Sequence, residues 1–257
     1  MTRSARPPRS DDSHGVRAPV GRVIAVIPTY NEAENLPLLV PQVLAQDPRL
    51  DVLVVDDDSP DGTGRIADQL AAADARVHVL HRPAKQGLGP AYRAGIRQAL
   101  DLGADCVIQM DADFSHPPEA LRTLLDGIEQ HDVVLGSRYL KGITVVNWPL
   151  GRILISYFGN WYVRQVTCLP ITDTTGGLRC IRRALLERMG FERIRSNGYA
   201  FQIEMNYRFV YYGAAIQEIP FLFLDRTRGE SKLSFRIALE ALWVAWWLRI
   251  SDAFGRL

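Results

Sequence analysis

The chain has 257 residues, of which 47% are hydrophobic and 23% are charged. This composition is typical of a globular protein and excludes a disordered chain, a collagen and a coiled coil. Its 30 Lys and Arg side chains balance its 29 Asp and Glu side chains, so the overall charge gives no reason to expect nucleic-acid binding. The cysteines, at positions 106, 168 and 180, have the spacing of neither a disulfide framework nor a zinc site.

Residues 1–21 are rich in Arg, Pro, Ser and Asp, so we expect them to form a disordered tail. The tail lacks the apolar core of a secretory signal peptide. A membrane-spanning helix needs roughly 20 apolar residues in succession, and the longest uninterrupted apolar run is 241–248. We therefore expect a cytoplasmic protein that touches a membrane from one side only.

From residue 22 onward, short apolar runs alternate with helical patterns. Runs typical of strands buried on both faces occur at 23–27, 52–55, 77–80, 106–110 and 133–135. Helices are expected at 35–45, 65–73, 91–100 and 118–129. This alternation predicts an α/β fold with a mostly parallel central sheet and helices on both faces.

After Gly136 the pattern changes, and helices dominate. They are expected at 150–163, 184–189, 201–212 and 233–250, with one more strand at 216–223. The first and last of these helices carry Trp and Tyr on broad apolar faces. We expect three parts: the tail at 1–21, a folded domain at 22–235 and an amphipathic C-terminal helix at 236–257.

The segments that follow the predicted strands are candidate sites, because open α/β sheets bind ligands beyond the carboxyl ends of their strands. Asp111 and Asp113 form a D-x-D pair after the strand at 106–110. Two carboxylates at this spacing can reach one hard divalent cation and the oxygens of a diphosphate. Such a pair also occurs in solvated loops, but its position at the end of a buried strand, just before His116, favours a metal site.

A second acidic cluster, Asp56-Asp57-Asp58, follows the strand at 52–55. Adjacent carboxylates repel one another, so their crowding needs a reason. A helix-capping turn is one interpretation, and hydrogen bonding to a nucleotide base or ribose is the one we favour. The chain has neither GxGxxG after its first strand nor GxxxxGK[ST], which argues against dinucleotide binding and P-loop chemistry.

A basic segment with a glycine, 226–232 (RTRGESK), follows the last predicted strand. It suits a solvated surface turn. It equally suits a clamp for phosphate oxygens, because guanidinium and ammonium groups both bind phosphate. The residues alone leave these two interpretations open.

Taken together, the motifs resemble glycosyltransferases of family 2 with the GT-A fold, and within them the dolichol-phosphate or polyprenol-phosphate mannose synthases. The resemblance covers roughly residues 22–235. It rests on 28–32 (PTYNE), 54–63 (VVDDDSPDGT), 110–119 (MDADFSHPPE), 136–139 (GSRY), 198–204 (GYAFQIE) and 218–232 (EIPFLFLDRTRGESK). The last two segments are the more specific ones. The ED and QxxRW signature of other family-2 enzymes is absent, and Asp173 occupies a comparable region.

The resemblance implies a role for each matching position. The nucleotide pocket would be lined by Pro28, Tyr30, Glu32, Val55 and Asp57. The sugar diphosphate and its Mg²⁺ or Mn²⁺ ion would be held by Asp111, Ala112 and Asp113. Ser115 stands where some relatives have Gln as a further metal ligand. Arg226 and Lys232 would bind the sugar nucleotide, and Arg138 and Arg152 the acceptor phosphate. Catalysis would depend on Asp113, Arg138, Arg226 and Lys232.

The implied reaction is an inverting transfer of mannose from GDP-mannose to a polyprenyl monophosphate. By analogy with phosphorylated side chains, the acceptor phosphate has a second pKa near 6 and is largely ionised, so it needs little general-base help. The expected partners are this lipid and the cytoplasmic face of the membrane, with a membrane-anchored subunit as an additional one. Trp-bearing helices at 150–163 and 233–250 suit a bilayer interface, although they could simply cover the sheet.

Three alternatives remain at this stage. The donor could be UDP-glucose or another UDP-sugar, because no motif settles the base or the sugar. A nucleotidyltransferase could share the sheet and the metal site, but its glycine-rich basic loop is replaced here by 28–32 (PTYNE). The chain could also be a catalytically silent module that keeps the fold and binds a nucleotide sugar. The retained Asp111 and Asp113 argue against such a loss of activity.

Overall fold

The structure, a computed structural model, describes residues 17–225 and 235–254. Its first elements are β1 (Val23–Thr29), α1 (Leu36–Leu44), β2 (Leu50–Asp56), α2 (Thr63–Ala73), β3 (Val77–His81), α3 (Leu88–Asp101), β4 (Cys106–Gln109), α4 (Ala120–Ile128) and β5 (Val133–Ser137). The later ones are β6 (Val145–Val146), α5 (Leu150–Thr167), β7 (Arg179–Arg182), α6 (Arg183–Met189), α7 (Gly198–Tyr211), β8 (Ile216–Pro220), β9 (Phe223–Leu224) and α8 (Phe235–Ala253).

The central sheet has seven strands in the order β3-β2-β1-β4-β7-β5-β8. All neighbouring strands are parallel except β7, which runs antiparallel to β4 and β5. This mostly parallel sheet confirms the predicted α/β fold. In its register Thr29 lies beside Asp56, so β1 and β2 end at the same edge.

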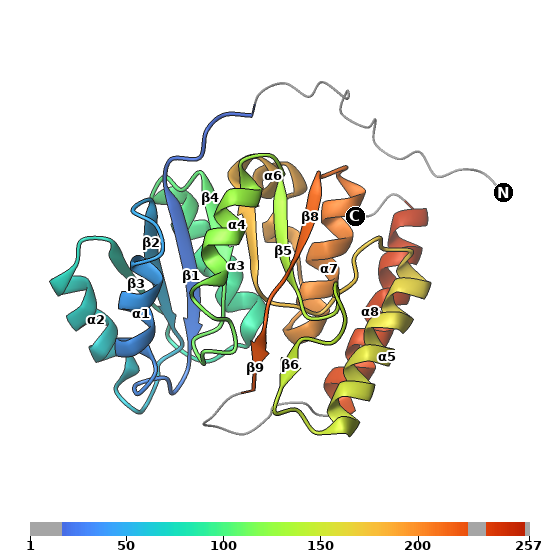
Figure 1. Ribbon diagram of the computed structural model, residues 1–257, viewed down its shortest axis with the longest axis horizontal. Coiled ribbons are helices and arrows are strands. Elements are labelled where there is room, and N and C mark those ends of the chain that lie inside the picture. The colour runs from blue at the N-terminus through green and yellow to red at the C-terminus, as the bar shows by residue number, and fades with distance from the viewer. Residues whose placement is uncertain (1–16, 226–234, 255–257) are drawn as a thin grey trace.

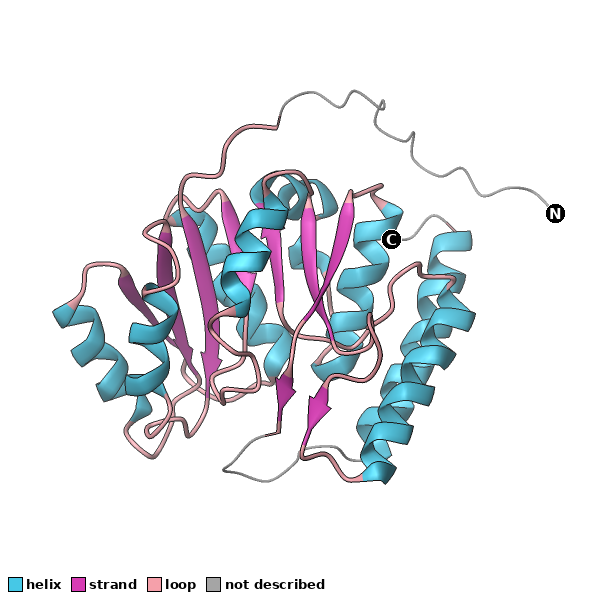
Figure 2. Ribbon diagram, in the orientation of Figure 1, coloured by secondary structure: helices cyan, strands magenta, loops and turns pink. Residues whose placement is uncertain are grey.

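Helices cover both faces of the sheet (Figure 1; Figure 2). The helices α1, α2 and α4 pack on one face, and α3, α6 and α7 on the other. Successive residues of β1 enter the two cores in turn, so that Ile27 contributes to one and Val26 to the other. Burial on both faces is the physical reason why the strand is a continuous apolar run.

Two features of the sheet differ from the prediction. The antiparallel strand β7, with the sequence Arg-Cys-Ile-Arg, is too short and too charged to show an apolar run, and its pairing with β4 and β5 makes it a strand. The strand expected at 216–223 divides into β8 and β9, and β9 pairs with β6 in a separate two-stranded sheet.

The helices α5 and α8 lie side by side at one end of the molecule, next to α7 (Figure 1). Val163, Ile203 and Leu248, one from each helix, form part of a small core between them. The Trp246 indole N–H donates a hydrogen bond to Tyr162 Oη at 2.8 Å. Across the described residues, the structure contains no helix with the length and hydrophobicity that crossing a bilayer requires.

Candidate active site

A cavity of about 410 Å³ opens at the edge where β1, β2 and β4 end. Seven predicted site residues from these strand ends line it: Pro28, Tyr30, Glu32, Asp57, Asp111, Ala112 and Asp113. The opposite wall comes from the starts of α3, α5 and α7 and from the segment before β7, through residues that include Leu88, Arg152, Thr175, Gly177, Tyr199 and Gln202. The cavity therefore lies at the edge of the sheet where the carboxyl-end rule for parallel sheets places a ligand site.

Other predicted site residues lie elsewhere. Val55 is buried in the core, where its side chain faces Gly95 of α3, and Ser115 is 1% exposed with an unpartnered hydroxyl oxygen. Neither lines the cavity, and neither does Arg138, which is buried. Arg226 and Lys232 lie outside the described residues.

The D-x-D pair sits in a tight turn that starts directly after β4. The backbone N–H of Asp111 donates to His116 Nδ1 at 2.9 Å, and the N–H of Ser115 donates to Asp113 Oδ1 at 3.1 Å. Burial lowers the pKa of His116, which keeps the imidazole neutral, so that Nδ1 can accept this bond. The turn therefore fixes the backbone of Asp111 and the carboxylate of Asp113 by local hydrogen bonds.

A second support for Asp111 comes from α3. The Tyr92 hydroxyl donates to Asp111 Oδ1 at 3.3 Å, and the Tyr92 ring stacks on Phe201 with centroids 5.9 Å apart. Burial and the neighbouring carboxylate raise the pKa of Tyr92 well above its usual value, so the hydroxyl keeps its proton and remains a donor. Sequence reasoning missed Tyr92 because a tyrosine within a helix carries no local signal of this contact.

The two carboxylates suit a divalent metal ion whose remaining coordination positions would be filled by the substrate. In the part of the chain that the structure describes, no three His, Cys, Asp or Glu side chains form a ready-made metal cluster. Mg²⁺ in nucleotide enzymes is commonly held by one or two carboxylates together with substrate phosphates. Asp111 and Asp113, which both line the cavity, could supply that protein share.

Asp56 and Asp57, at and just after the end of β2, have different roles. Asp56 accepts hydrogen bonds from the hydroxyls of Ser59 at 2.6 Å and Thr29 at 3.3 Å, so it stabilises the turn. Asp57 lines the cavity and pairs with Arg82 at 2.5 Å. Burial raises the pKa of Asp57 against the opposing effect of Arg82. Asp56 therefore fits the interpretation as a turn, whereas nucleotide binding by Asp57, which lines the cavity, stays a prediction.

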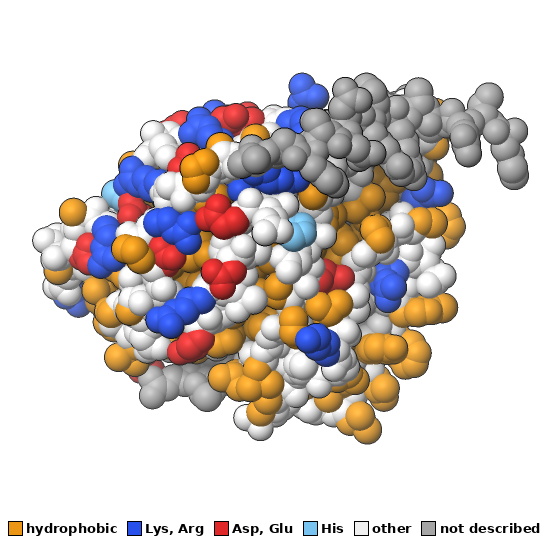
Figure 3. All heavy atoms as spheres, turned by 45° about the horizontal axis from the view of Figure 1, so that its top comes forward, with side chains coloured by type: hydrophobic (Ala, Val, Ile, Leu, Met, Phe, Trp, Pro, Cys, Tyr) orange, Lys and Arg blue, Asp and Glu red, His pale blue; other side chains and the backbone are white. Residues whose placement is uncertain are grey.

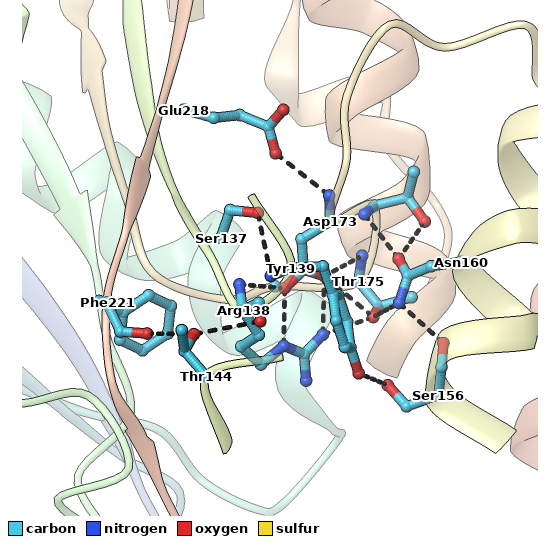
Figure 4. Close-up of polar contacts among 12 residues, drawn as sticks. Ser137, Arg138, Tyr139, Thr144, Ser156, Asn160, Asp173, Thr175, Glu218 and Phe221 are labelled. Carbon is cyan, nitrogen blue, oxygen red and sulfur yellow. Dashed lines mark hydrogen bonds and ion pairs between the residues drawn. The ribbon is translucent and has the colours of Figure 1, made fainter. Parts of the chain in front are cut away.

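Arg138 and Asp173 form a buried ion pair behind the pocket (Figure 4). Arg138 Nε donates to Asp173 Oδ2 at 2.6 Å and Nη2 donates to Oδ1 at 2.7 Å. Nη2 also donates to the Thr175 hydroxyl at 2.7 Å. Burial by itself would raise the pKa of Asp173, but Arg138 leaves that pKa below its usual value. The Arg138 charge is thus matched within the protein.

The segment 172–177 is held by this pair and by two further side chains (Figure 4). Glu218 accepts from the backbone N–H groups of Thr172 at 2.8 Å and Asp173 at 3.1 Å. Asn160 Oδ1 accepts from the Thr174 N–H at 2.7 Å. Because Thr175 and Gly177 of the same segment line the cavity, this network fixes one wall of the pocket.

Arg152, in the first turn of α5, is a cation that lines the cavity, and Lys85 is another. Arg152 Nη1 donates to Asp225 Oδ1 at 2.8 Å, and its guanidinium lies 4.1 Å from the centroid of the Trp148 ring. Its buried Nε has no hydrogen-bond partner. An unpartnered N–H of a cation is a donor suited to a phosphate oxygen.

Two curated relatives match most of the chain. The undecaprenyl-phosphate mannosyltransferase of Micrococcus luteus is 48% identical over 221 residues, covering 86% of this chain and 91% of the relative. The polyprenol monophosphomannose synthase of Mycolicibacterium smegmatis is 46% identical over 232 residues, covering 89% and 88%.

Solved structures share the fold at low sequence identity. Glucosyl-3-phosphoglycerate synthase from Mycobacterium tuberculosis, in complex with phosphoglyceric acid, has a TM-score of 0.62 and 17% identity over 92% of this chain and 80% of that one. A mannosyltransferase from Pyrobaculum calidifontis, in complex with GDP-Man and Mn²⁺, has a TM-score of 0.52 and 19% identity over 91% and 72%. Residues 24–190 match the profile of glycosyl transferase family 2. The chain belongs to glycosyl transferase family 2.

Proposed function

We propose that the chain transfers mannose from GDP-mannose to a polyprenyl monophosphate at this pocket. The observation that carries the proposal is that Asp111 and Asp113 line one cavity together with Asp57 and Arg152. The names of the relatives from Micrococcus luteus and Mycolicibacterium smegmatis support the sugar and the lipid acceptor.

In this reaction an oxygen of the acceptor phosphate attacks the anomeric carbon of mannose. The new carbon–oxygen bond forms as the bond to the β-phosphate breaks, so GDP leaves and the configuration inverts. The nucleophile is already an anion near neutral pH, and no side chain has to remove a proton from it. The main task of the protein is therefore to bring two anions together in line.

The residues of the pocket divide this task. Tyr30, Glu32 and Asp57 would bind the nucleoside, and Arg152 the acceptor phosphate. Mg²⁺ or Mn²⁺ on Asp111 and Asp113 would neutralise charge on the departing diphosphate. Arg226 and Lys232 remain proposed phosphate ligands, and Arg138 is proposed to act through Asp173 and the segment 172–177.

The donor is tested by offering the purified chain labelled GDP-mannose and polyprenyl phosphate, with and without EDTA. We expect an acid-labile, organic-soluble product only when Mg²⁺ or Mn²⁺ is present, because the diphosphate leaves with its charge neutralised. UDP-glucose serves as the matched donor, since the related fold is known in complexes with both UDP-glucose and GDP-Man. Transfer from UDP-glucose alone would overturn the GDP-mannose proposal, and undiminished transfer in EDTA would overturn the metal site.

We also propose that the outer face of α5 and α8 lies on the cytoplasmic surface of the membrane. Large apolar side chains are exposed there: Leu150, Leu154, Ile155, Tyr157, Phe158 and Trp161 from α5, and Trp243, Trp246, Trp247, Ile250 and Phe254 from α8 and the residue after it. Hydrophobic side chains gather along the right-hand margin in Figure 3. A contiguous apolar patch on this scale is unusual for a surface that faces only water.

The position of this face suits a lipid acceptor. Arg152 lines the pocket from the first turn of α5, so the apolar face begins where the phosphate would bind. A polyprenyl chain could then run along α5 while its phosphate enters the cavity. The exposed Arg164 and Arg249 on the same helices add positive charge that anionic lipids attract.

Vesicle flotation tests the membrane proposal. The double variant Phe158→Glu/Trp243→Glu is expected to lose most of its association with phosphatidylglycerol vesicles at low salt, because both side chains are more than half exposed, at 60% and 69%. Leu38→Glu is the matched control, since Leu38 is 58% exposed on α1, away from α5 and α8. Equal binding by all three proteins would contradict a direct lipid contact and would favour a partner subunit on this face.

A further inference from the structure

Gln202 of α7 has an unsatisfied hydrogen-bond acceptor at the pocket. The side chain is 2% exposed, yet it lines the cavity. Among the described residues, the buried polar atoms without a partner include two from the cavity lining: Gln202 Oε1 and Arg152 Nε. Buried polar groups are normally paired, so an unpaired one at a ligand site indicates that the ligand provides its partner.

The missing side chain of Gly177 shows what Gln202 faces. A Cβ atom at Gly177 would lie 3.3 Å from His116 Cε1, 3.7 Å from Gln202 Nε2 and 3.8 Å from Asp111 Oδ2. The glycine thus keeps open a space that is bordered by the first carboxylate of the D-x-D pair and by Nε2 of the Gln202 amide, the group that also carries the unpartnered Oε1. A group attached to a diphosphate at Asp111 would enter this space.

The hydrogen-bonding chemistry of Gln202 Oε1 limits which ligand groups can be its partner. Gln202 Oε1 accepts hydrogen bonds and donates none. An ionised diphosphate carries only acceptors, so it cannot satisfy this oxygen. A hydroxyl group can, and the sugar is the hydroxyl-bearing group that is joined directly to the β-phosphate. In the proposed function the nucleoside would bind toward Tyr30 and Asp57, which line the cavity from the ends of β1 and β2.

We infer that Gln202 recognises the transferred sugar through its side-chain amide, with Oε1 accepting a hydrogen bond from a sugar hydroxyl beside the space that Nε2 and Gly177 border. The inference rests on the proposed function and deepens it, because it names a residue that selects the donor sugar. Arg152 Nε, the other unpartnered atom, is a donor and so suits an anion instead. Gln202 Oε1 therefore belongs to the proposed sugar subsite, and Arg152 Nε to the proposed phosphate subsite.

The test compares the binding of GDP-mannose and GDP, each with Mn²⁺, by titration calorimetry. Gln202→Met keeps the length of the side chain and removes the acceptor. We expect its dissociation constant for GDP-mannose to rise about tenfold, the size of one lost hydrogen bond, while that for GDP stays unchanged. In turnover the KM for GDP-mannose is expected to rise with little change in kcat, because the bond is present before and during transfer.

Gln217→Met is the matched control, because Gln217 also has a buried, unpartnered Oε1 but lies on β8, outside the cavity lining. It is expected to leave both dissociation constants unchanged. Equal weakening of GDP and GDP-mannose by Gln202→Met would overturn the inference, since Gln202 would then act on the nucleotide or on the fold. Unchanged binding of both ligands would overturn it as well.

Gly177→Ala provides an independent variant, because the glycine has no positive φ and its backbone accepts alanine. Its methyl group would occupy the proposed sugar space, so GDP-mannose is expected to bind several-fold more weakly while GDP is unaffected. The unaltered chain tests the donor in the same titrations. If it binds UDP-glucose in place of GDP-mannose, the proposed donor fails, and the effect of Gln202→Met is then measured with UDP-glucose against UDP.

Discussion

Asp113→Ala is expected to lower metal-dependent mannose transfer by about 10³-fold or more, which corresponds to roughly 4 kcal/mol of transition-state stabilisation. Asp113 lines the cavity two residues after Asp111, and these carboxylates are the protein share of the proposed metal site. With one of them removed, the departing diphosphate loses much of its charge neutralisation. Initial rates of transfer to polyprenyl phosphate at saturating Mn²⁺ measure the effect.

The matched control is Asp126→Ala, because Asp126 is exposed on α4 and lies outside the cavity lining. This variant is expected to keep full activity. The circular dichroism spectrum of Asp113→Ala should equal that of the unaltered chain, because Asp113 is only half-buried and lies in a loop. Full transfer by Asp113→Ala would show that the metal, if needed, is bound elsewhere.

Asp173→Asn is expected to lower the free energy of unfolding by about 3–5 kcal/mol, the usual cost of leaving one partner of a buried ion pair uncompensated. Asp173 is 2% exposed and Arg138 is 5% exposed, so water cannot replace the lost carboxylate charge. The amide keeps the shape of the side chain, which limits the change to charge and hydrogen bonding. Urea denaturation followed by tryptophan fluorescence measures the difference.

Glu187→Gln is the control for this experiment. Glu187 pairs with Arg183 at 2.7 Å on the surface of α6, where both side chains are largely exposed. Such a pair contributes only about 0.3–0.5 kcal/mol. If Asp173→Asn lowers the free energy of unfolding no more than Glu187→Gln does, the proposed contribution of the buried ion pair to stability is contradicted. The double variant Arg138→Met/Asp173→Leu is expected to recover part of the stability, because it removes both buried charges.

The same pair predicts a dependence of stability on pH. Arg138 holds the pKa of Asp173 below the ordinary value of 3.8 in the folded chain. A carboxylate with a lowered folded pKa contributes stability that is fully present above the unfolded pKa and is lost as the pH falls through the folded pKa. The difference in stability between the unaltered chain and Asp173→Asn should therefore be constant near neutral pH and shrink below about pH 4.

The sequence by itself determined the α/β class, most strands and helices, and the edge of the sheet that carries the pocket. The physical reason is that these signals are local. A strand buried on both faces must be apolar throughout, as β1 is, and the carboxyl ends of parallel strands must meet at one edge. Asp57, Asp111 and Asp113 could therefore be assigned to one pocket before any contact between them was known.

Only the tertiary structure decided which polar groups face the ligand and which face one another. Arg138 has the sequence context of a phosphate ligand, yet it pairs with Asp173, which is distant along the chain. The strand β7 exists because β4 and β5 flank it. Tyr92 reaches Asp111, and Gln202 reaches the pocket, from helices on one face of the sheet. Contacts between distant segments depend on packing, and no periodicity or motif within either segment encodes them.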